Sequence, residues 1–329
     1  MADTFNYRID HHGSLVRPAG LTRTDPESVR AAVEEAVVRQ RKLRSTVVTD
    51  GDYPREDFRS AVLDGVSGFR RTTEKGADGL DRWVAEALPK ADGPLVADWA
   101  ARLTEATVIA AKVSLPSPAY LAATTFEPGL GPASARELGE ALAQIVHAEI
   151  RLLVAQGVRL VQLNNPLLLD WPGESPLSYE DALAVEVTAA RLDERPEGVR
   201  VGVCPGWAAP ATVDRARVEE LYATVPADRW ILPFHQGTEA ELDLVRYLPE
   251  DRDVCLGVVD ATAPALEDID TVMSRVDAAA ELKDIEDMAV SPSRGFADVA
   301  TSPLLTAEEQ RQKLVLVETI ARYCWGNEF

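Results

Sequence analysis

The sequence is poor in cysteine, histidine and aromatic residues. Its 329 residues include 3 Cys and 4 His, and aromatic residues make up 6% of the chain. An odd number of widely spaced cysteines does not fit a disulfide framework, so we expect free thiols in a reducing compartment. There is no apolar run of about 18 residues, and the first residues lack the basic and apolar regions of a signal peptide. We therefore expect a cytoplasmic protein.

Basic charge is also scarce, because 34 Lys and Arg residues face 54 Asp and Glu residues and give a formal charge of -20. Such a chain repels phosphate backbones and anionic lipid, and no basic stripe offsets the repulsion locally. The hydrophobic fraction of 46% is that of a globular protein with an ample core. We expect a small-molecule substrate as the partner, with no nucleic acid and no membrane, and nothing in the sequence indicates an oligomeric state.

Eight apolar β-runs separated by helices predict an α/β fold. The expected strands are 7–11, 45–49, 107–113, 158–163, 199–204, 230–233, 254–259 and 285–290. Helix starts are indicated by Asp25 before a proline, and by Ser134, Ser178, Thr238 and Thr306, each with an acid three residues later. Strands of this kind are parallel and buried on both faces.

The count of eight favours a single (β/α)8 TIM barrel over residues 1–329, with an open doubly wound sheet as the alternative. Residues 53–103 are irregular, and we expect them to be an insertion of short helices and a small hairpin between strands two and three. No G-x-G-x-x-G follows the first strand and there is no Walker A loop, which argues against dinucleotide and P-loop folds.

In a barrel of this kind the pocket is built from the C-terminal ends of the strands and the loops after them. The polar residues at those ends are His11, His12, Ser14, Asp50, Asp52, Ser114, Ser117, Asn164, Asn165, Cys204, His235, Asp260, Ser291 and Arg294. Imidazoles and carboxylates that meet at one mouth can bind a metal or can hydrogen-bond a small substrate. The remaining histidine, His147, is predicted on the water-facing side of a helix.

Two of these residues have further interpretations. Cys204 can act as a ligand or nucleophile, but a free cysteine is more often buried packing. Arg294 can clamp a carboxylate or phosphate of the substrate, or it can form a salt bridge at the rim.

Several motifs resemble the cobalamin-independent methionine synthases, in particular their C-terminal catalytic barrel and the shorter single-barrel relatives. The similar stretches are 10–14 (Asp-His-His-Gly-Ser) with Arg17-Pro18, 49–53 (Thr-Asp-Gly-Asp-Tyr), 115–118 (Leu-Pro-Ser-Pro), 161–166 (Val-Gln-Leu-Asn-Asn-Pro), 257–260 (Gly-Val-Val-Asp), 291–296 (Ser-Pro-Ser-Arg-Gly-Phe), Lys313 and Trp325-Gly326. The resemblance runs over nearly the whole chain and implies a (β/α)8 barrel.

The resemblance also implies a zinc site made by a histidine, two cysteines and a glutamate, and most of it is replaced here. Gly202 and Cys204 stand at the His-x-Cys pair, His235 stands beside the glutamate position, and Arg294 replaces the second cysteine. The carboxylates that hold the homocysteine amine in the family fall at Asp52, which remains an acid, and at Asn164, which is neutral. Zinc activates homocysteine as a thiolate, so the family reaction is not expected; Zn(II) is the less expected metal, and folate binding stays undecided.

The exchange of sulfur ligands for imidazole leads to the first functional hypothesis, a metal-dependent oxygenase or lyase acting on a small polar metabolite. In it, mononuclear non-haem Fe(II) is the cofactor. The expected metal ligands are His11, His12, His235 and Asp52; the catalytic residues are Asp52, Asp260 and Arg294; the substrate-binding residues are Ser14, Ser117, Asn164, Asn165, Cys204 and Arg294. The alternative is a divergent methyl or alkyl transferase of the same family, and the third is a metal-free binding or acid–base protein.

Overall fold

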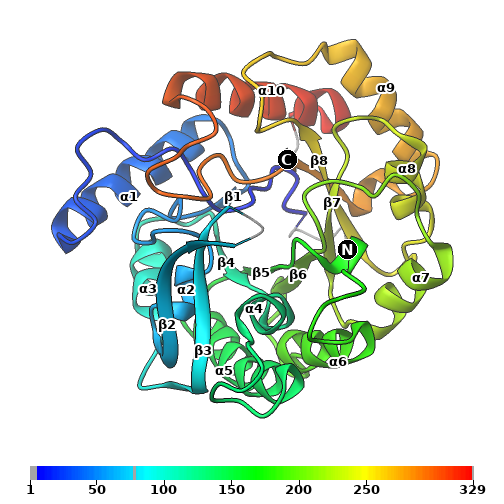
Figure 1. Ribbon diagram of the computed structural model, residues 1–329. Helices are drawn as coiled ribbons and strands as arrows, with labels where there is room; N and C mark the ends of the chain where they lie inside the picture. The colour runs from blue at the N-terminus through cyan, green and yellow to red at the C-terminus, as the bar shows by residue number, and fades with distance from the viewer. Residues whose placement is uncertain (1–5, 77–78, 328–329) are drawn as a thin grey trace.

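A curled parallel sheet forms the centre of the computed structural model, which describes residues 6–76 and 79–327 (Figure 1). Seven strands follow one another in the order β1-β4-β5-β6-β7-β8-β9. They are β1 (Val47–Val48), β4 (Ala110–Pro116), β5 (Leu160–Asn164), β6 (Arg200–Cys204), β7 (Arg229–Pro233), β8 (Asp253–Val259) and β9 (Met288–Pro292). The α/β class predicted from the sequence is thereby confirmed.

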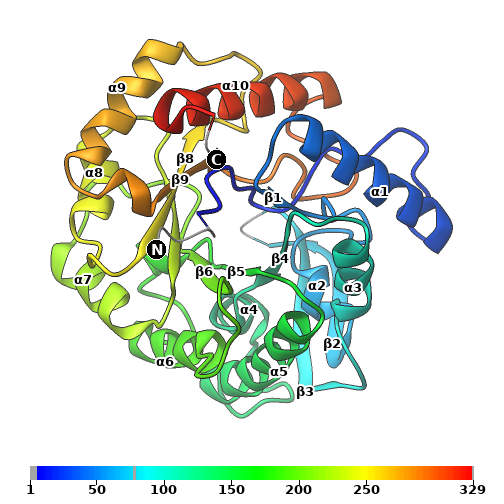
Figure 2. The same cartoon turned by 180° about the vertical axis from the view of Figure 1, so that it is seen from behind.

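Helices surround this sheet and shield its outer face from water (Figures 1 and 2). They are α1 (Pro26–Lys42), α2 (Ser60–Leu63), α3 (Ala97–Glu105), α4 (Pro118–Thr125), α5 (Ala135–Ala155), α6 (Tyr179–Ala190), α7 (Arg215–Thr224), α8 (Glu239–Arg246), α9 (Ile269–Ala280) and α10 (Ala307–Trp325), with 3-10 turns η1 (Leu168–Asp170) and η2 (Ile285–Asp287). Within the described residues no helix is long and apolar enough to cross a membrane.

The predicted helix starts are confirmed. Side chains of Asp25, Ser134, Ser178, Thr238 and Thr306 each accept a hydrogen bond from a backbone N–H of the first turn. The acid three residues later completes a reciprocal capping box at Thr238 and at Thr306. These starts were predictable because an N-cap depends only on residues within one turn.

The predicted first strand, 7–11, is reduced to a single bridge between Ile9 and Val290 of β9. On its other side, the Thr46 hydroxyl accepts from the Ile9 N–H at 2.9 Å and donates to the Ile9 carbonyl at 3.0 Å. The Ile9 segment therefore lies between β9 and β1, the two ends of the curled sheet. Tyr7, the first residue of the predicted strand, has a φ of 48°, which is outside the extended region that a strand requires.

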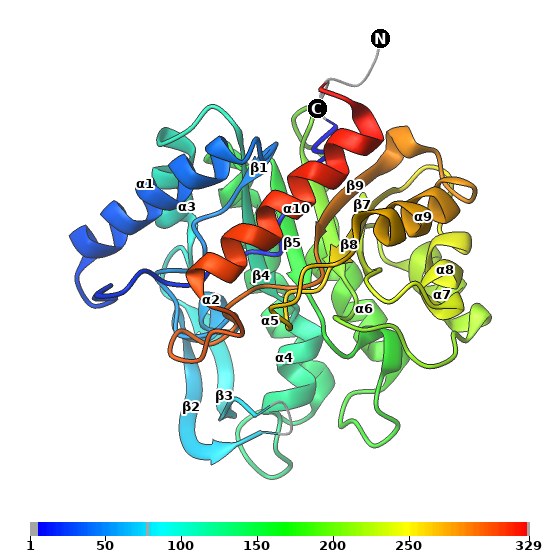
Figure 3. The same ribbon diagram turned by 90° about the horizontal axis from the view of Figure 1, so that it is seen from above.

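Residues 53–103 contain α2, most of α3 and an antiparallel hairpin of β2 (Val66–Lys75) and β3 (Asp81–Ala91), as the irregular composition suggested. Figure 3 shows this hairpin at the same end of the molecule as the loop between β9 and α10. Asp57 pairs with Val299 of that loop in an antiparallel bridge. The segment before the hairpin is thus fastened to the loop that carries Arg294.

Buried charge occupies the interior of the curled sheet near the start of its strands. The carboxylate of Asp10 accepts from Lys112 Nζ at 2.6 Å, from Arg229 Nη1 at 3.3 Å and from the His11 N–H at 2.7 Å. Burial alone would raise the pKa of Asp10, but the charges of Lys112 and Arg229 and these hydrogen bonds outweigh it and lower the pKa. A small apolar layer follows toward the strand ends, made of Cys204, Ile231, Cys255 and Ala289.

Replacing Lys112 by methionine is expected to destabilise the protein strongly, because Asp10 would keep only one cationic partner. Breaking a buried ion pair on one side typically costs about 3–5 kcal/mol. Since Arg229 remains, we expect a loss of about 3 kcal/mol in urea unfolding. The control Arg136→Gln breaks surface pairs of an exposed arginine with Glu140 and Asp181 and should cost less than about 1 kcal/mol. Similar small losses in both variants would contradict a structural role for the Asp10 ion pairs.

Candidate functional site

A tight turn at Gly13 brings polar groups from two strand ends together. A Cβ on Gly13 would lie 2.9 Å from Ser114 Oγ and 3.2 Å from Asp52 Oδ2. The backbone is held on both sides, because Thr49 Oγ1 donates to the Gly13 carbonyl at 2.9 Å and Ser114 Oγ donates to the His12 carbonyl at 2.5 Å. Only glycine combines this φ with such close neighbours.

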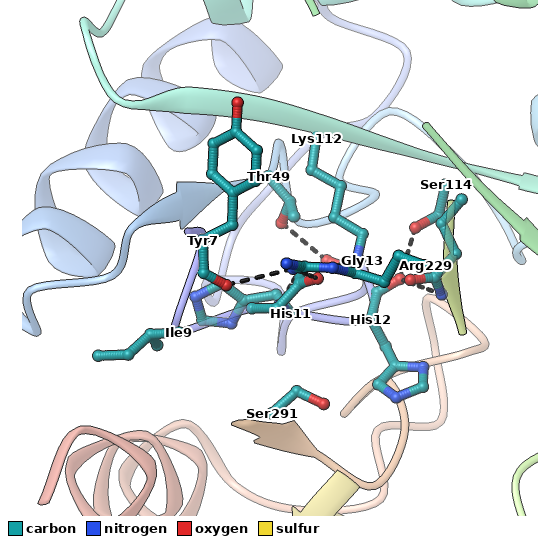
Figure 4. Close-up of polar contacts among 12 residues, drawn as sticks. Tyr7, Ile9, His11, His12, Gly13, Thr49, Lys112, Ser114, Arg229 and Ser291 are labelled. Atoms are coloured by element: carbon teal, nitrogen blue, oxygen red, sulfur yellow. Dashed lines mark hydrogen bonds and ion pairs between the residues drawn. The ribbon is translucent and has the colours of Figure 1, made fainter. Parts of the chain in front are cut away.

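The His12 side chain is buried without a hydrogen-bond partner. It is 7% exposed, and neither ring nitrogen has a partner among the described residues. Burial, and then the charge of Lys112, lower the pKa of His12 to about 3, so the ring is neutral at physiological pH. In Figure 4 the ring projects away from Ser114, on the side where Ser291 lies. A neutral imidazole offers one donor and one acceptor, and here both are available to a ligand.

His11 lies apart from this position. Its Nε2 is 2.9 Å from the Ser45 hydroxyl, which precedes β1. Burial lowers the pKa of His11 to about 4. The side chains of the two adjacent histidines therefore lie in different surroundings (Figure 4). His11 contacts the segment before β1, and His12 lies in the candidate site.

The predicted carboxylate pair, Asp50 and Asp52, shares one guanidinium. Arg55 Nη1 lies 2.5 Å from Asp52 Oδ1, and Arg55 Nη2 lies 3.0 Å from Asp50 Oδ2. Asp52 has a φ of 56°, and Arg17 donates to its carbonyl at 2.8 Å. Burial raises the pKa of Asp52 to about 6 despite the Arg55 charge. Asp52 Oδ2 is left facing the Gly13 turn.

Arg294 is fixed between an acid and an aromatic ring. Its Nη2 donates to Asp298, and its guanidinium carbon lies 4.0 Å from the centre of the Trp207 ring. Ser14 Oγ lies 3.4 Å from Asp298 Oδ1 and accepts from the Ala297 N–H at 3.3 Å. The predicted rim salt bridge thus exists, but Arg294 Nε stays buried without a partner.

Other predicted residues line the strand ends with internal partners. The Cys204 thiol donates to the Gly206 carbonyl at 3.5 Å, and burial raises its pKa to about 12. Asn164 Oδ1 accepts from Gln162 Nε2 at 2.6 Å, and Ser291 Oγ donates to the Pro292 carbonyl at 2.9 Å.

Three further residues named in the sequence analysis are half-buried. His235 is half-buried, with its carbonyl accepting from Arg275. Asp260 is half-buried and accepts from the Thr262 N–H at 2.8 Å. His147, expected to face water, is half-buried on α5 with a buried Nδ1, because packing around a helix is broader than its apolar stripe.

No three His, Cys, Asp or Glu side chains in the described part of the chain are arranged to hold a metal ion. The expected ligands His11, His12, His235 and Asp52 are therefore not assembled into one group. The zinc positions implied by the resemblance do not fit zinc either. Gly202 has no side chain and Arg294 is itself a cation, so Cys204 is the one possible ligand among these three positions.

Sequence reasoning missed one buried carboxylate beside this site, Glu186 of α6. Its Oε1 accepts from Asn165 Nδ2 at 2.7 Å and from Ser117 Oγ, while Oε2 is buried without a partner. Burial raises the pKa of Glu186 to about 7. The available signal was an acid among the inward positions of α6, which include Leu183 and Ala190.

The curled parallel sheet and the helices around it define a barrel-like α/β fold. A model of the cobalamin-independent synthase catalytic domain matches residues 131–315, more than half of the chain, so the protein belongs to that family. Two uncharacterized Bacillus subtilis proteins, YxjH and YxjG, are each 24% identical to it over 97% of this chain and 95% of their own.

Solved structures share the fold. A B12-independent methionine synthase from Shewanella sp. W3-18-1, in complex with selenomethionine, aligns with a TM-score of 0.82 at 17% identity and covers 96% of this chain and 97% of its own. A putative vitamin-B12 independent methionine synthase from Listeria monocytogenes aligns with a TM-score of 0.75 at 21% identity, covering 98% of both chains. A methyltransferase from Methanosarcina mazei aligns at 0.60 and 11% identity, covering 98% of this chain and 96% of its own.

Glu186 should make stability depend on pH. Its folded pKa of about 7 exceeds the ordinary value of 4.5, so the fold favours the protonated form, and stability should fall as pH rises from 4.5 to 7. Glu186→Gln keeps an acceptor for Ser117 and Asn165 but cannot ionise. Because one pKa unit corresponds to about 1.4 kcal/mol, the wild type should lose more than about 1 kcal/mol relative to the variant over this range.

This difference is measurable by urea unfolding at several pH values. The control Glu140→Gln changes an exposed acid of α5. Its free energy of unfolding should change with pH as that of the wild type does. If the free energy of unfolding of Glu186→Gln has the same pH dependence as that of the wild type, Glu186 is not held in the protonated form by the fold.

Proposed function

We propose that this protein is a divergent methyl or alkyl transferase of the cobalamin-independent synthase family, acting on a small polar substrate that carries an amine. The observation that carries the proposal is Asp52, whose free Oδ2 faces the Gly13 turn beside Ser114. The family resemblance places an amine-binding carboxylate at the same position. Family membership and the named relatives support a transferase better than the iron oxygenase or lyase hypothesis, for which no comparison offers support.

Asp52 has the protonation behaviour that such a reaction needs. With a pKa of about 6 it is ionised at neutral pH and is still basic enough to receive a proton. In the proposed step, the substrate amine at Asp52 attacks the alkyl carbon, the donor leaves with the former bonding pair, and a proton of that amine passes to Asp52 Oδ2. Arg55 holds the other oxygen of the same carboxylate at 2.5 Å and fixes its orientation.

Neighbouring groups would bind and orient the substrate. Ser114 Oγ already donates to the His12 carbonyl, so its lone pairs remain to accept from the substrate. Asn164 keeps its amide N–H groups, because its hydrogen bond from Gln162 uses only the oxygen. No step is assigned to zinc, since the residues at the zinc positions do not fit that metal.

The architecture behind this proposal is one domain. We propose that the whole chain forms a single (β/α)8 barrel, with the Ile9 segment as the eighth strand position and 53–103 as an insertion. The pairing of Ile9 with Val290 on one side and with Thr46 on the other supports this closure.

Asp52→Asn should reduce methyl transfer by about 100-fold or more, because a positioned base contributes about 10²–10⁴ to a rate. Transfer would be followed by mass spectrometry from methyl-folate and S-adenosylmethionine to a panel of small amines, amino acids and homocysteine. The exposed Asp277→Asn variant is the matched control and should keep full activity. Oxygen uptake with added ferrous iron, and no transfer from either donor, would overturn the transferase in favour of the oxygenase.

Cys204→Ser should keep activity within a few-fold. The Cys204 thiol is protonated and donates to Gly206, and a serine hydroxyl can donate to the same carbonyl. Elemental analysis of purified wild type is expected to show zinc well below one ion per chain. Methylation of homocysteine at ordinary enzymatic rates, with both zinc and activity lost in Cys204→Ser, would show that the original site still functions.

A further inference from the structure

We propose that the groove between the C-terminal end of α1 and the first half of α10 binds a small aliphatic carboxylate. The two helices are neighbours in the ring of helices around the sheet (Figures 1 and 2), and a cavity of about 330 Å³ lies between them. Sites for small molecules have volumes of this order. The described residues that line the groove include none of the candidate functional site, so the inference does not rest on the proposed function.

The floor of the groove is apolar. Leu15, Val16 and Leu314 line it, and each is at most 8% exposed. Gln40 also lines it, but its amide is fully used inside the protein. It accepts from the Thr49 N–H at 3.0 Å and donates to the Thr49 carbonyl at 2.9 Å and, within α1, to the carbonyl one turn earlier at 3.2 Å. The inner part of a ligand therefore meets hydrocarbon, and its binding depends on the apolar area that leaves water.

Hydrogen bonds fix this floor and leave one amide available. The Val16 N–H donates to Gln310 Oε1 at 2.6 Å, and the Tyr53 hydroxyl donates to the Val16 carbonyl at 3.1 Å. Because Val16 uses only the oxygen of Gln310, the amide N–H groups of this side chain remain as donors for a ligand. A carboxylate oxygen is an acceptor that suits them.

The rim of the groove is cationic. Among the described residues that line it, three carry positive charge and none is acidic: Arg39 and Lys42 of α1, and Arg311 of α10. All three are exposed, so their aliphatic stems extend the apolar wall and their charged ends lie at its edge. The chain as a whole has a formal charge of -20, which makes this cluster a local exception. Together, floor and rim select a molecule with an apolar body and an anionic end.

Lys42 is the cation with the most to gain from a ligand. Arg39 pairs with Glu35 at 2.8 Å, and Arg311 pairs with Glu308 at 2.7 Å, each on its own helix. Lys42 forms no ion pair within residues 6–76 and 79–327. A carboxylate at the rim would supply the missing partner.

A second copy of this chain fits the groove less well than a free carboxylate does. In a two-fold symmetric contact the same patch meets itself, so the three rim cations of one copy would face those of the other. A carboxylate brings the opposite charge.

The test is calorimetric titration of the full chain with straight-chain carboxylates from butanoate to octanoate, and with the primary alcohols of the same lengths. Affinity should rise about fourfold with each added CH2 group until the groove is filled. Octanoate should bind at least about threefold tighter than octanol, because the alcohol gains nothing from the rim cations.

Lys42→Gln should lower the affinity for octanoate about threefold and leave that for octanol unchanged. Arg41→Gln is the matched control, since Arg41 is an exposed cation of the same last turn of α1 but is not part of the lining. It should leave both affinities unchanged. If Arg41→Gln weakens octanoate binding as much as Lys42→Gln does, the effect is one of overall charge and the inference is overturned.

A readout on the wild type locates the site without a variant. A photoreactive diazirine analogue of octanoate should label peptides within 36–43 or 307–314, as mapped by mass spectrometry, and excess octanoate should prevent the labelling. Labelling confined to other segments, no binding of octanoate, or octanol bound as tightly as octanoate would each overturn the inference. So would a dimer in light scattering whose chemical cross-links join these two segments, if octanoate does not bind, because the groove would then be an interface between copies.

Discussion

The buried ion pairs of Asp10 are the interaction on which the site depends. Asp10 belongs to a segment with only one bridge to the sheet, so backbone pairing alone holds it weakly. Lys112 of β4 and Arg229 of β7 reach its carboxylate from two sides of the interior. Because these strands are neighbours of neither Ile9 nor each other, the ion pairs fix the segment across the sheet. They thereby determine where His12 and the Gly13 turn lie.

The Gly13 turn brings this fixed segment close to polar side chains of other elements. The turn allows Ser114 and Asp52 to approach from β4 and from the loop after β1. Asp52 is paired with Arg55, and Arg294 is stacked on Trp207. Of the zinc positions that the resemblance implies, Gly202 and Arg294 offer no metal ligand.

Much of the fold could be predicted from the sequence, but the site could be predicted only as a set of candidates. The predicted strand ends made Asp52, Asn164 and Arg294 candidates, because parallel strands all end at one face. The same reasoning placed His11 beside His12, although His11 turns to Ser45. It also missed Glu186, which reaches Asn165 from a helix. A pattern along a strand does not specify which neighbouring element a side chain contacts.

The sequence by itself determined the α/β class, the helix starts and the order of the strands, because caps, turns and apolar periodicity act over a few residues. Only the tertiary structure decided which charges neutralise one another and which polar groups stay without a partner. The sequence does not specify that Arg55 pairs with Asp52. Nor does it specify that the His11 ring contacts Ser45 while the neighbouring His12 ring has no hydrogen-bond partner among the described residues. The His11 contact joins residues 34 positions apart, which no local pattern specifies, and burial then shifts the pKa of His12 and Asp52.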